Sequence, residues 1–232
     1  MRRRHIVALV APALFLAACG ELLRVQAPVA PPAEFPERYY LQAHKQGRPV
    51  YRVDPAESLV VIEVRRGGSL ARLGHDHVVA SRNLTGYVAP GEGRADMFVA
   101  LARLVVDEAQ LRQEAGFDTQ PSESDIDATR SNMLRHVLEV ERFPFALIAV
   151  SGAVATQKKA TLSVSITLHG QTRTLWVPAE IEADEQNIRV AARLALNQTD
   201  FAITPYSLLG GAIAVKDALE LRLRISARRI AD

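Results

Sequence analysis

The strongest constraint on the fold is a strict alternation of apolar and polar residues in three stretches of the chain. Residues 162–168 read LSVSITL, residues 188–196 read IRVAARLAL, and residues 219–225 read LELRLRI. Successive side chains of a β-strand point to opposite faces, so this period of two predicts strands with one dry face and one wet face. His169-Gly170-Gln171 follows the first stretch and predicts a hairpin turn between antiparallel neighbours.

The number of such runs predicts a mainly β protein. Residues 60–64 and 172–177 add two further expected strands. Many antiparallel strands with dry inner faces close into a barrel or stack as a sandwich. About eight strands leave an interior that is either filled by side chains or holds one small ligand. Ala100, Ala102 and Ala192 would make room for a cavity, although small residues fit close helix packing equally well.

One helix is expected beside the strands. Residues 98–106 are apolar on both faces apart from Arg103, which predicts a strand that something covers on its outside. Apolar residues then recur at helical spacing between positions 126 and 138, after Ser124 or Asp125 as the N-cap. We expect this helix to lie across the barrel wall or to close one of its ends.

The N-terminus has the features of a secretory signal. Three arginines precede a short apolar run, Ile6–Leu16, and small residues lead to Cys19, the only cysteine. Leu16-Ala17-Ala18-Cys19 resembles the lipobox of bacterial lipoproteins. That resemblance implies that residues 1–18 are removed and that Cys19 is acylated as the first residue of the mature chain. The alternative is an ordinary signal peptide that is cleaved near Ala18.

The residues after the cysteine predict a location. Gly20 and Glu21 follow Cys19, and the lack of aspartate at the second position favours the outer membrane in proteobacterial lipoproteins. We therefore expect the protein on the periplasmic side of the cell envelope, anchored in the outer membrane through Cys19. With that cysteine acylated, no thiol remains for a disulfide.

Proline content and charge set the domain organisation. Five prolines within residues 20–49 predict an extended linker, although Tyr39, Tyr40 and Leu41 could dock on the domain and disorder is the alternative. We assign residues 19–49 to a lipidated, proline-rich linker and residues 50–232 to one barrel domain. The chain has 28 basic and 26 acidic side chains, so loss of three arginines with the signal leaves 25 minus 26, or −1. The sequence has no cluster of basic residues of the kind that binds nucleic acid, so a nucleic-acid partner is not expected.

A series of short motifs runs in a fixed order through residues 50–232. They are Tyr51-Arg52-Val53-Asp54, Ser58, Leu73-Gly74-His75-Asp76-His77, Gly86, Asn132-Met133, Phe143-Pro144, Ser151-Gly152, Leu168-His169-Gly170, Asn197, Thr199, Asp200, Phe201, Ile203, Val215 and Asp217. In this order and spacing they resemble the YceI-like domain, a family of secreted and periplasmic barrels that bind polyisoprenoid and other lipids. The resemblance implies an antiparallel, lipocalin-like barrel with one helix and an elongated apolar cavity for a long isoprenoid or another amphiphilic lipid. Residues 74–77, Gly-His-Asp-His, indicate one branch of the family. The sequence departs from the usual family pattern at Glu57, where most members have histidine, and at Ala202, where most have glycine.

The resemblance and the alternation together predict a set of ligand-binding residues. The set is His75, His77, Phe98, Ala100, Ala102, Ile166, Leu168, His169, Trp176 and Phe201. Trp176 is equally typical of a packed core. Arg103 either extends into solvent, pairs with an acid or points at a ligand headgroup. Asn197 and Asp200 are expected to fix the turn around Phe201.

The histidines allow three interpretations. Residues two apart in an extended segment point the same way, so His75 and His77 are expected to face one spot. With His169 they would supply three nitrogens suited to zinc or copper. Alternatively they bond to backbone or water, or they donate hydrogen bonds to a headgroup such as a quinone oxygen.

The sequence favours a binding protein over an enzyme, because it has no nucleophile elbow, no phosphate-binding glycine loop and no evident acid–base pair of carboxylates. We therefore expect an envelope lipoprotein that binds or carries an isoprenoid- or quinone-like lipid in its barrel, with no other cofactor. Its expected partners are that lipid and the membrane, and the sequence identifies no protein partner. Two alternatives stay open: a metal-binding or redox-accessory module built on His75, His77 and His169, and a solid barrel with a structural or interaction role.

Overall fold

The computed structural model describes residues 29–152 and 158–231. The predicted signal peptide, residues 1–18, and the predicted acylation site Cys19 lie outside the described residues. The chain divides into two units, Met1–Ala30 and Pro31–Asp232, and the description below concerns the second.

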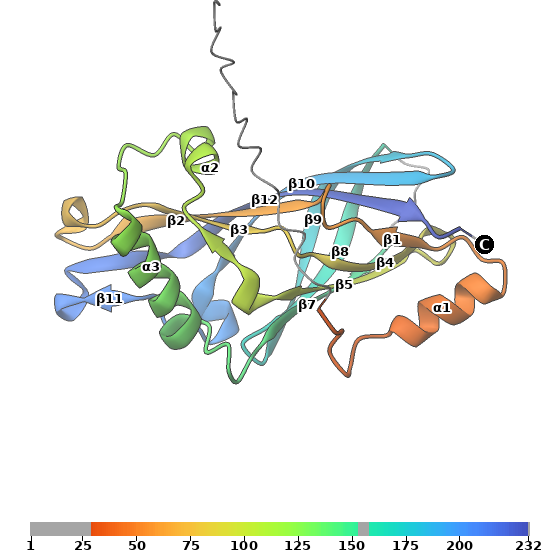
Figure 1. The fold of residues 1–232 in the computed structure, drawn as a ribbon, viewed down its shortest axis with the longest axis horizontal. Helices are drawn as coiled ribbons and strands as arrows, with labels where there is room; N and C mark the ends of the chain where they lie inside the picture. Colours follow the sequence, from red (N-terminus) through yellow and green to blue (C-terminus); the bar gives the residue numbers. More distant parts are fainter. Residues whose placement is uncertain (1–28, 153–157, 232) are drawn as a thin grey trace, which may run out of the picture. The chain divides into compact units, whose positions relative to one another are not determined.

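The described residues form one antiparallel sheet of 12 strands (Figure 1). The strands are β1 (Tyr51–Val53), β2 (Leu59–Gly67), β3 (His77–Ser81), β4 (Thr85–Ala89), β5 (Arg94–Ala100), β6 (Val105–Val106), β7 (Phe145–Ser151), β8 (Lys159–Leu168), β9 (Gln171–Ala183), β10 (Asn187–Asn197), β11 (Ser207–Leu208) and β12 (Ile213–Arg229). Eight of them close a barrel in the order β1-β4-β5-β7-β8-β9-β10-β12 and back to β1. The prediction of a mainly β, lipocalin-like antiparallel barrel is confirmed.

Strand β12 organises the wall because it is shared between partners. One edge pairs with β10 from Asn197↔Ala218 to Asn187↔Arg228. The other edge pairs first with β2 and then, nearer its C-terminus, with β1. Strands β2, β3 and β6 therefore extend the wall at one end of the barrel. We call this end the α3 end, after the helix that lies there (Figure 1), and the opposite end, at the turn after β9, the β9–β10 end.

The wall is not paired to the same extent all round. Strands β8 and β9 share 10 register pairs, from Lys159↔Glu180 to Leu168↔Gln171. Strands β9 and β10 share only five, from Ile188↔Ala183 to Ala192↔Ala179, all at the β9–β10 end. We call the incompletely paired boundary between these two strands the β9–β10 seam.

Helical segments of three kinds accompany the sheet. The α-helices are α1 (Glu37–Lys45), α2 (Ala109–Glu114) and α3 (Glu123–Asn132), and a π-helical turn, Met133–Val137, continues α3. Short 3₁₀ turns are η1 (Ala71–Leu73), η2 (Pro90–Glu92), η3 (Leu101–Arg103), η5 (Gln198–Phe201) and η6 (Leu209–Gly211). None of the helices in residues 29–152 and 158–231 has the length and apolar composition needed to cross a bilayer.

The predicted helix is α3. Its N-cap lies two residues before Ser124, the earlier of the two expected caps. Ser122 is its N-cap: the Asp125 N–H donates to Ser122 Oγ at 3.3 Å, and the Ser122 N–H donates to Asp125 Oδ2 at 3.1 Å. This reciprocal capping box satisfies two N–H groups that would otherwise lack partners. Side chains of α3 contribute to the lining of the barrel interior, so the helix closes one end, as expected.

The outer face of β5 is covered by α1, which lies in the predicted linker. Tyr40 of α1 is fully buried, and its hydroxyl donates to Asp96 Oδ2 at 2.5 Å. Burial, together with this hydrogen bond, raises the pKa of Tyr40, so the hydroxyl stays protonated as the donor. Phe35 packs edge-on against Phe98 with ring centroids 4.9 Å apart. The linker boundary at residue 49 is therefore corrected: residues 31–49 belong to the compact unit, because Tyr40 and Ala43 bury against the barrel.

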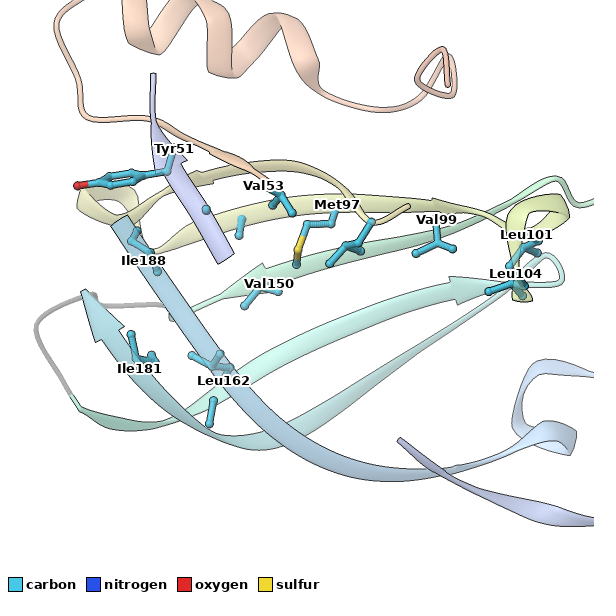
Figure 2. Close-up of a cluster of buried hydrophobic side chains, with 14 of the residues drawn as sticks. Tyr51, Val53, Met97, Val99, Leu101, Leu104, Val150, Leu162, Ile181 and Ile188 are labelled. Atoms are coloured by element: carbon cyan, nitrogen blue, oxygen red, sulfur yellow. The ribbon is translucent and has the colours of Figure 1, made fainter. Parts of the chain in front are cut away.

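The core gathers the inward side chains of the barrel strands (Figure 2). Ile181, Ile188 and Ala227 are buried at the β9–β10 end. Inward side chains near the opposite end, such as Leu194 and Leu196 of β10, are only half-buried. The interior is thus closed off from solvent at the β9–β10 end and more open at the α3 end.

Candidate functional site

The barrel encloses a cavity of about 570 Å³. Inward residues of β2, β3, β5, β7, β8, β9, β10 and β12 line it, and most are valine, leucine, isoleucine or alanine. A cavity of this size lies within the usual range for small-molecule sites. The alternative of a solid barrel is wrong, because side chains do not fill the interior.

The polar part of the lining is concentrated at one end. The polar lining residues are Arg66, His75, His77, Ser81, Asp125, Thr129, Asn132, Gln198 and Tyr206. All of them except Ser81 belong to α3 or to segments that meet at the α3 end. The cavity is therefore a dry tube with a polar mouth, a distribution that suits an amphiphile with one polar end.

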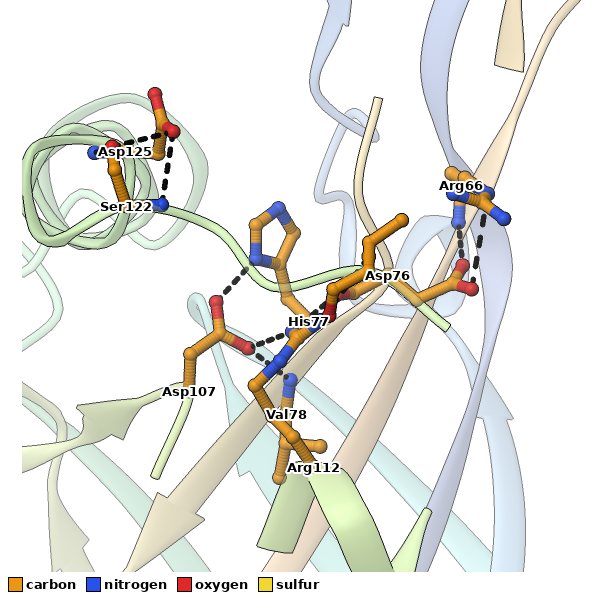
Figure 3. Close-up of polar contacts among 9 residues, drawn as sticks. Arg66, Asp76, His77, Val78, Asp107, Arg112, Ser122 and Asp125 are labelled. Atoms are coloured by element: carbon orange, nitrogen blue, oxygen red, sulfur yellow. Dashed lines mark hydrogen bonds and ion pairs between the residues drawn. The ribbon is translucent and has the colours of Figure 1, made fainter. Parts of the chain in front are cut away.

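A buried carboxylate orients His77 at this mouth (Figure 3). Asp107 Oδ2 lies 2.6 Å from His77 Nδ1, while Asp107 Oδ1 accepts from the Val78 N–H at 2.9 Å and from Arg112 Nη1 at 2.6 Å. Burial alone would raise the pKa of Asp107, but the hydrogen bonds from His77 and the Val78 N–H, with Arg112, outweigh burial and lower it. An ionised Asp107 only accepts hydrogen bonds, so His77 Nδ1 is the donor. Nε2 of His77 then lies on the side of the ring that points away from Asp107.

His75 lies beside His77, with ring centroids 6.2 Å apart, and both line the cavity, as their spacing predicts. Nδ1 of His75 is buried and has no hydrogen-bond partner among the described residues. Asp76 points away from the pair and accepts from the Arg66 N–H at 2.8 Å. A buried ring nitrogen without a partner is costly unless something else satisfies it.

His169 is not brought to this place. It occupies the β8–β9 turn with a φ of 51°, its ring packs on Phe143 at 4.4 Å, and Nε2 lies 3.2 Å from Glu139 Oε1. It does not line the cavity. Within the part of the chain that the structure describes, no three His, Cys, Asp or Glu side chains are grouped to hold a metal ion. The alternative of a three-histidine metal site therefore lacks its third ligand.

The remaining predicted ligand residues divide into two groups. Ile166, Leu168 and Phe201 line the cavity. Four others do not: Phe98, Ala100, Ala102 and Trp176. Met97 and Val99 take the inward face of β5, so Phe98 and Ala100 face outward. Periodicity could not choose the inner face here because both faces are apolar.

Ala102 and Trp176 are displaced for separate reasons. The predicted strand over residues 98–106 breaks at η3, which leaves Ala102 exposed on a 3₁₀ turn. Trp176 is 73% exposed, since its neighbour Val177 takes the inward position on β9. The outward tryptophan is neither a core residue nor a cavity residue.

Sequence reasoning missed the polar residues that α3 contributes to the mouth, namely Asp125, Thr129 and Asn132. Their spacing places them on one face of the helix, which would have identified them once that face was assigned to the interior. Arg66 and Tyr206 were also missed: Arg66 follows the alternating residues of β2, and Tyr206 lies in the loop before β11.

Comparison with known proteins agrees with this architecture. The YceI-like domain model matches residues 51–227. A polyisoprenoid-binding domain from Saccharophagus degradans superposes with a TM-score of 0.57 at 12% identity, covering 78% of this chain and 98% of that one. BcnA of Burkholderia cenocepacia gives a TM-score of 0.50 at 15% identity, covering 75% and 98%. No curated protein sequence matches. The family model covers most of the chain and the superpositions reproduce its fold, so the chain belongs to the YceI-like domain family.

Proposed function

We propose that this protein binds or carries an apolar lipid of isoprenoid or quinone type in its barrel, as a lipoprotein of the cell envelope. The observation that carries the proposal is the hollow interior of about 570 Å³, with an aliphatic wall and polar side chains at one end only. Each methylene moved from water into such a wall contributes about 0.8 kcal/mol. The polyisoprenoid-binding domain that shares the fold supports the same ligand class.

The tail and the headgroup would occupy different parts of the cavity. The tail would lie along the inward leucines and isoleucines of β8, β10 and β12, which line the cavity. The headgroup would lie at the α3 end, where the buried Nδ1 of His75 has no partner among the described residues and Asp107 fixes the ring of His77. A histidine N–H can donate to a quinone carbonyl, and a charged histidine favours an anionic headgroup.

Anchoring through acylated Cys19, on the periplasmic side of the outer membrane, belongs to the same proposal. The arginine-rich start, the apolar run and the lipobox-like Leu16-Ala17-Ala18-Cys19 support it. If the anchor is correct, the N-terminal peptide isolated from cells should carry acyl chains on Cys19, which mass spectrometry would detect. A free Cys19, or a chain that begins elsewhere, would contradict the anchor while leaving the barrel's ligand untouched.

Native mass spectrometry of the chain carrying Cys19→Ser tests the ligand. We expect a mass excess of lipid size that disappears on denaturation. Ala192→Phe should abolish it, since Ala192 lines the cavity, whereas Ala195→Phe on the exposed face of the same strand should retain it. A folded protein without bound lipid, whose melting temperature does not rise when a polyisoprenoid or a quinone is added, would overturn the proposal.

A further inference from the structure

Exposed leucines gather at the mouth of the cavity. Leu73 is 61% exposed, Leu208 48% and Leu209 74%, and they are three of the five large hydrophobic residues that are exposed in the described part of the chain. Leu73 and Leu208 also line the cavity. We call these three residues the leucine rim. The remaining two, Leu41 on α1 and Trp176 on β9, lie on other elements.

Close backbone packing brings the two parts of the rim together. The Leu70 N–H donates to Ala212 O at 2.7 Å, which joins the η1 segment to the hairpin between β11 and β12. Gly68 makes the approach possible, because a Cβ there would lie 2.4 Å from the Ala212 oxygen. In Figure 1, β11 and the β2–β3 connection lie at the same end of the barrel as α3.

The tip of this hairpin is built at a cost to folding. Leu209 has a φ of 51°, in the left-handed region that bulky side chains rarely adopt. Its side chain is also mostly in water, so its burial does not offset the strain. A strained residue whose side chain contributes little to the core indicates a role outside folding.

Basic side chains outnumber acidic ones beside the rim. Residues 63–76 and 202–217 contain Arg65, Arg66, Arg72 and Lys216, and their acids are Glu63, Asp76 and Asp217 at the ends of the two segments. Arg65 pairs with Glu63, and Arg66 pairs with Asp118. Among the described residues, by contrast, no ion pair involves Arg72 or Lys216. Two exposed cations therefore flank the exposed leucines.

We propose that the leucine rim docks on the surface of a bilayer that contains anionic phospholipid, with the cavity mouth facing the membrane. Exposed apolar side chains beside basic ones are the combination that binds such surfaces, through buried apolar area and electrostatic attraction. Docking would let a lipid tail pass between bilayer and cavity without crossing water. The inference rests on the proposed function for its purpose, but not for its test.

Flotation of the Cys19→Ser chain with mixed phosphatidylethanolamine and phosphatidylglycerol vesicles tests the docking. The rim variant combines Leu73→Ser, Leu208→Ser and Leu209→Ser, and we expect its vesicle-bound fraction to fall by roughly tenfold. The control combines Leu41→Ser and Trp176→Ser, which remove the other two exposed side chains, and should bind as the parent does. Equal binding by the rim variant and the control, or no binding by the parent, would overturn the inference.

A charge-matched pair tests the electrostatic part. Arg72→Glu with Lys216→Glu should weaken binding to the anionic vesicles, and added salt should reduce the difference from the parent. Arg189→Glu with Arg193→Glu makes the same charge change on exposed residues of β10 and should weaken binding less. An equal loss in both variants would show that net charge alone is responsible.

Cavity occupancy separates this inference from the proposed function. Each variant is loaded from detergent micelles containing a polyisoprenoid and is then analysed by native mass spectrometry. Leu209→Ser changes the one rim residue that does not line the cavity, so a Leu209→Ser variant that retains the lipid but binds vesicles less supports both proposals. Rim-dependent vesicle binding by a parent whose cavity takes up no lipid would support docking and refute the carrier function.

Discussion

The two ends of the barrel are made from the same alternating strands, yet they are finished differently. At the β9–β10 end, Ile181 and Ile188 are buried, and the Tyr51 hydroxyl lies 3.2 Å from Glu185 O in the turn. At the α3 end, Leu194 and Leu196 of the same sheet are half-buried, and histidines and α3 surround the opening. Alternation thus builds the wall, while the connections decide whether an end of the cavity is closed or becomes a mouth.

The largest expected effect concerns the charges that support the mouth. Asp107→Asn leaves Arg112, which is only 6% exposed, without its carboxylate partner. Breaking a buried ion pair by removing one charge costs about 3–5 kcal/mol of unfolding free energy, measured by urea denaturation. Asp118→Asn, which removes the exposed partner of Arg66, should cost less than about 1 kcal/mol. Similar losses in both variants would mean that Asp107 does not hold this end together.

Acid titration of stability sharpens the same point. The pKa of Asp107 is lowered in the folded state from its ordinary value of 3.8. Its contribution to stability is therefore fully present above pH 3.8 and is lost as pH falls through the lowered pKa. Denaturation curves recorded below about pH 4 should show a smaller acid loss for Asp107→Asn than for the parent. Parallel acid profiles would contradict this assignment.

The closed end and the mouth should also respond differently to the same kind of truncation. Ile188 and Leu196 both line the cavity, but Ile188 is only 4% exposed, so Ile188→Ala removes more packed contacts and should cost about 2–5 kcal/mol. Leu196→Ala on the same strand enlarges a space that is already open, so it should cost clearly less. Chemical denaturation of both variants measures the contrast, and equal costs would mean that the two ends are equally packed.

The smallest expected effect is at the turn after η5. Ala202 has a φ of 55°, a conformation that glycine adopts without a Cβ penalty. Ala202→Gly should therefore raise stability by roughly 1 kcal/mol, seen as a higher melting temperature. Ala195→Gly, in an exposed strand position, should lower it by about 0.5–1 kcal/mol. A loss in Ala202→Gly would show that the side chain contributes contacts worth more than the strain.

Much of this fold could be predicted from the sequence, because strands with one solvent-exposed face show a clear alternation of apolar and polar residues. The runs around 162–168, 188–196 and 219–225 fall in β8, β10 and β12, and the turn at His169 lies where it was expected. The prediction for residues 98–106 was wrong for the opposite reason. Both faces of this stretch are apolar, because one faces the cavity and the other packs against Phe35 of the N-terminal segment. A tertiary contact more than 60 positions away in the chain leaves no local period.

The candidate site was predictable only in part. The spacing of His75 and His77 predicts a shared direction, and both line the cavity. The partner that orients His77 is Asp107, which stands 30 residues further along the chain, so no spacing rule connects them. The exclusion of His169 likewise depends on Phe143 and Glu139, which occupy its ring in the folded chain.

The seam between β9 and β10 has a consequence for how much the interior can hold. These strands share five register pairs, against 10 between β8 and β9 and 11 between β10 and β12. Separating β9 from β10 therefore breaks fewer backbone hydrogen bonds than opening either neighbouring boundary. Widening the cavity beyond its volume of about 570 Å³ would therefore cost less at this seam than at either neighbouring boundary. For the proposed lipid ligand, the seam is the part of the wall that would yield first to a longer or more branched tail.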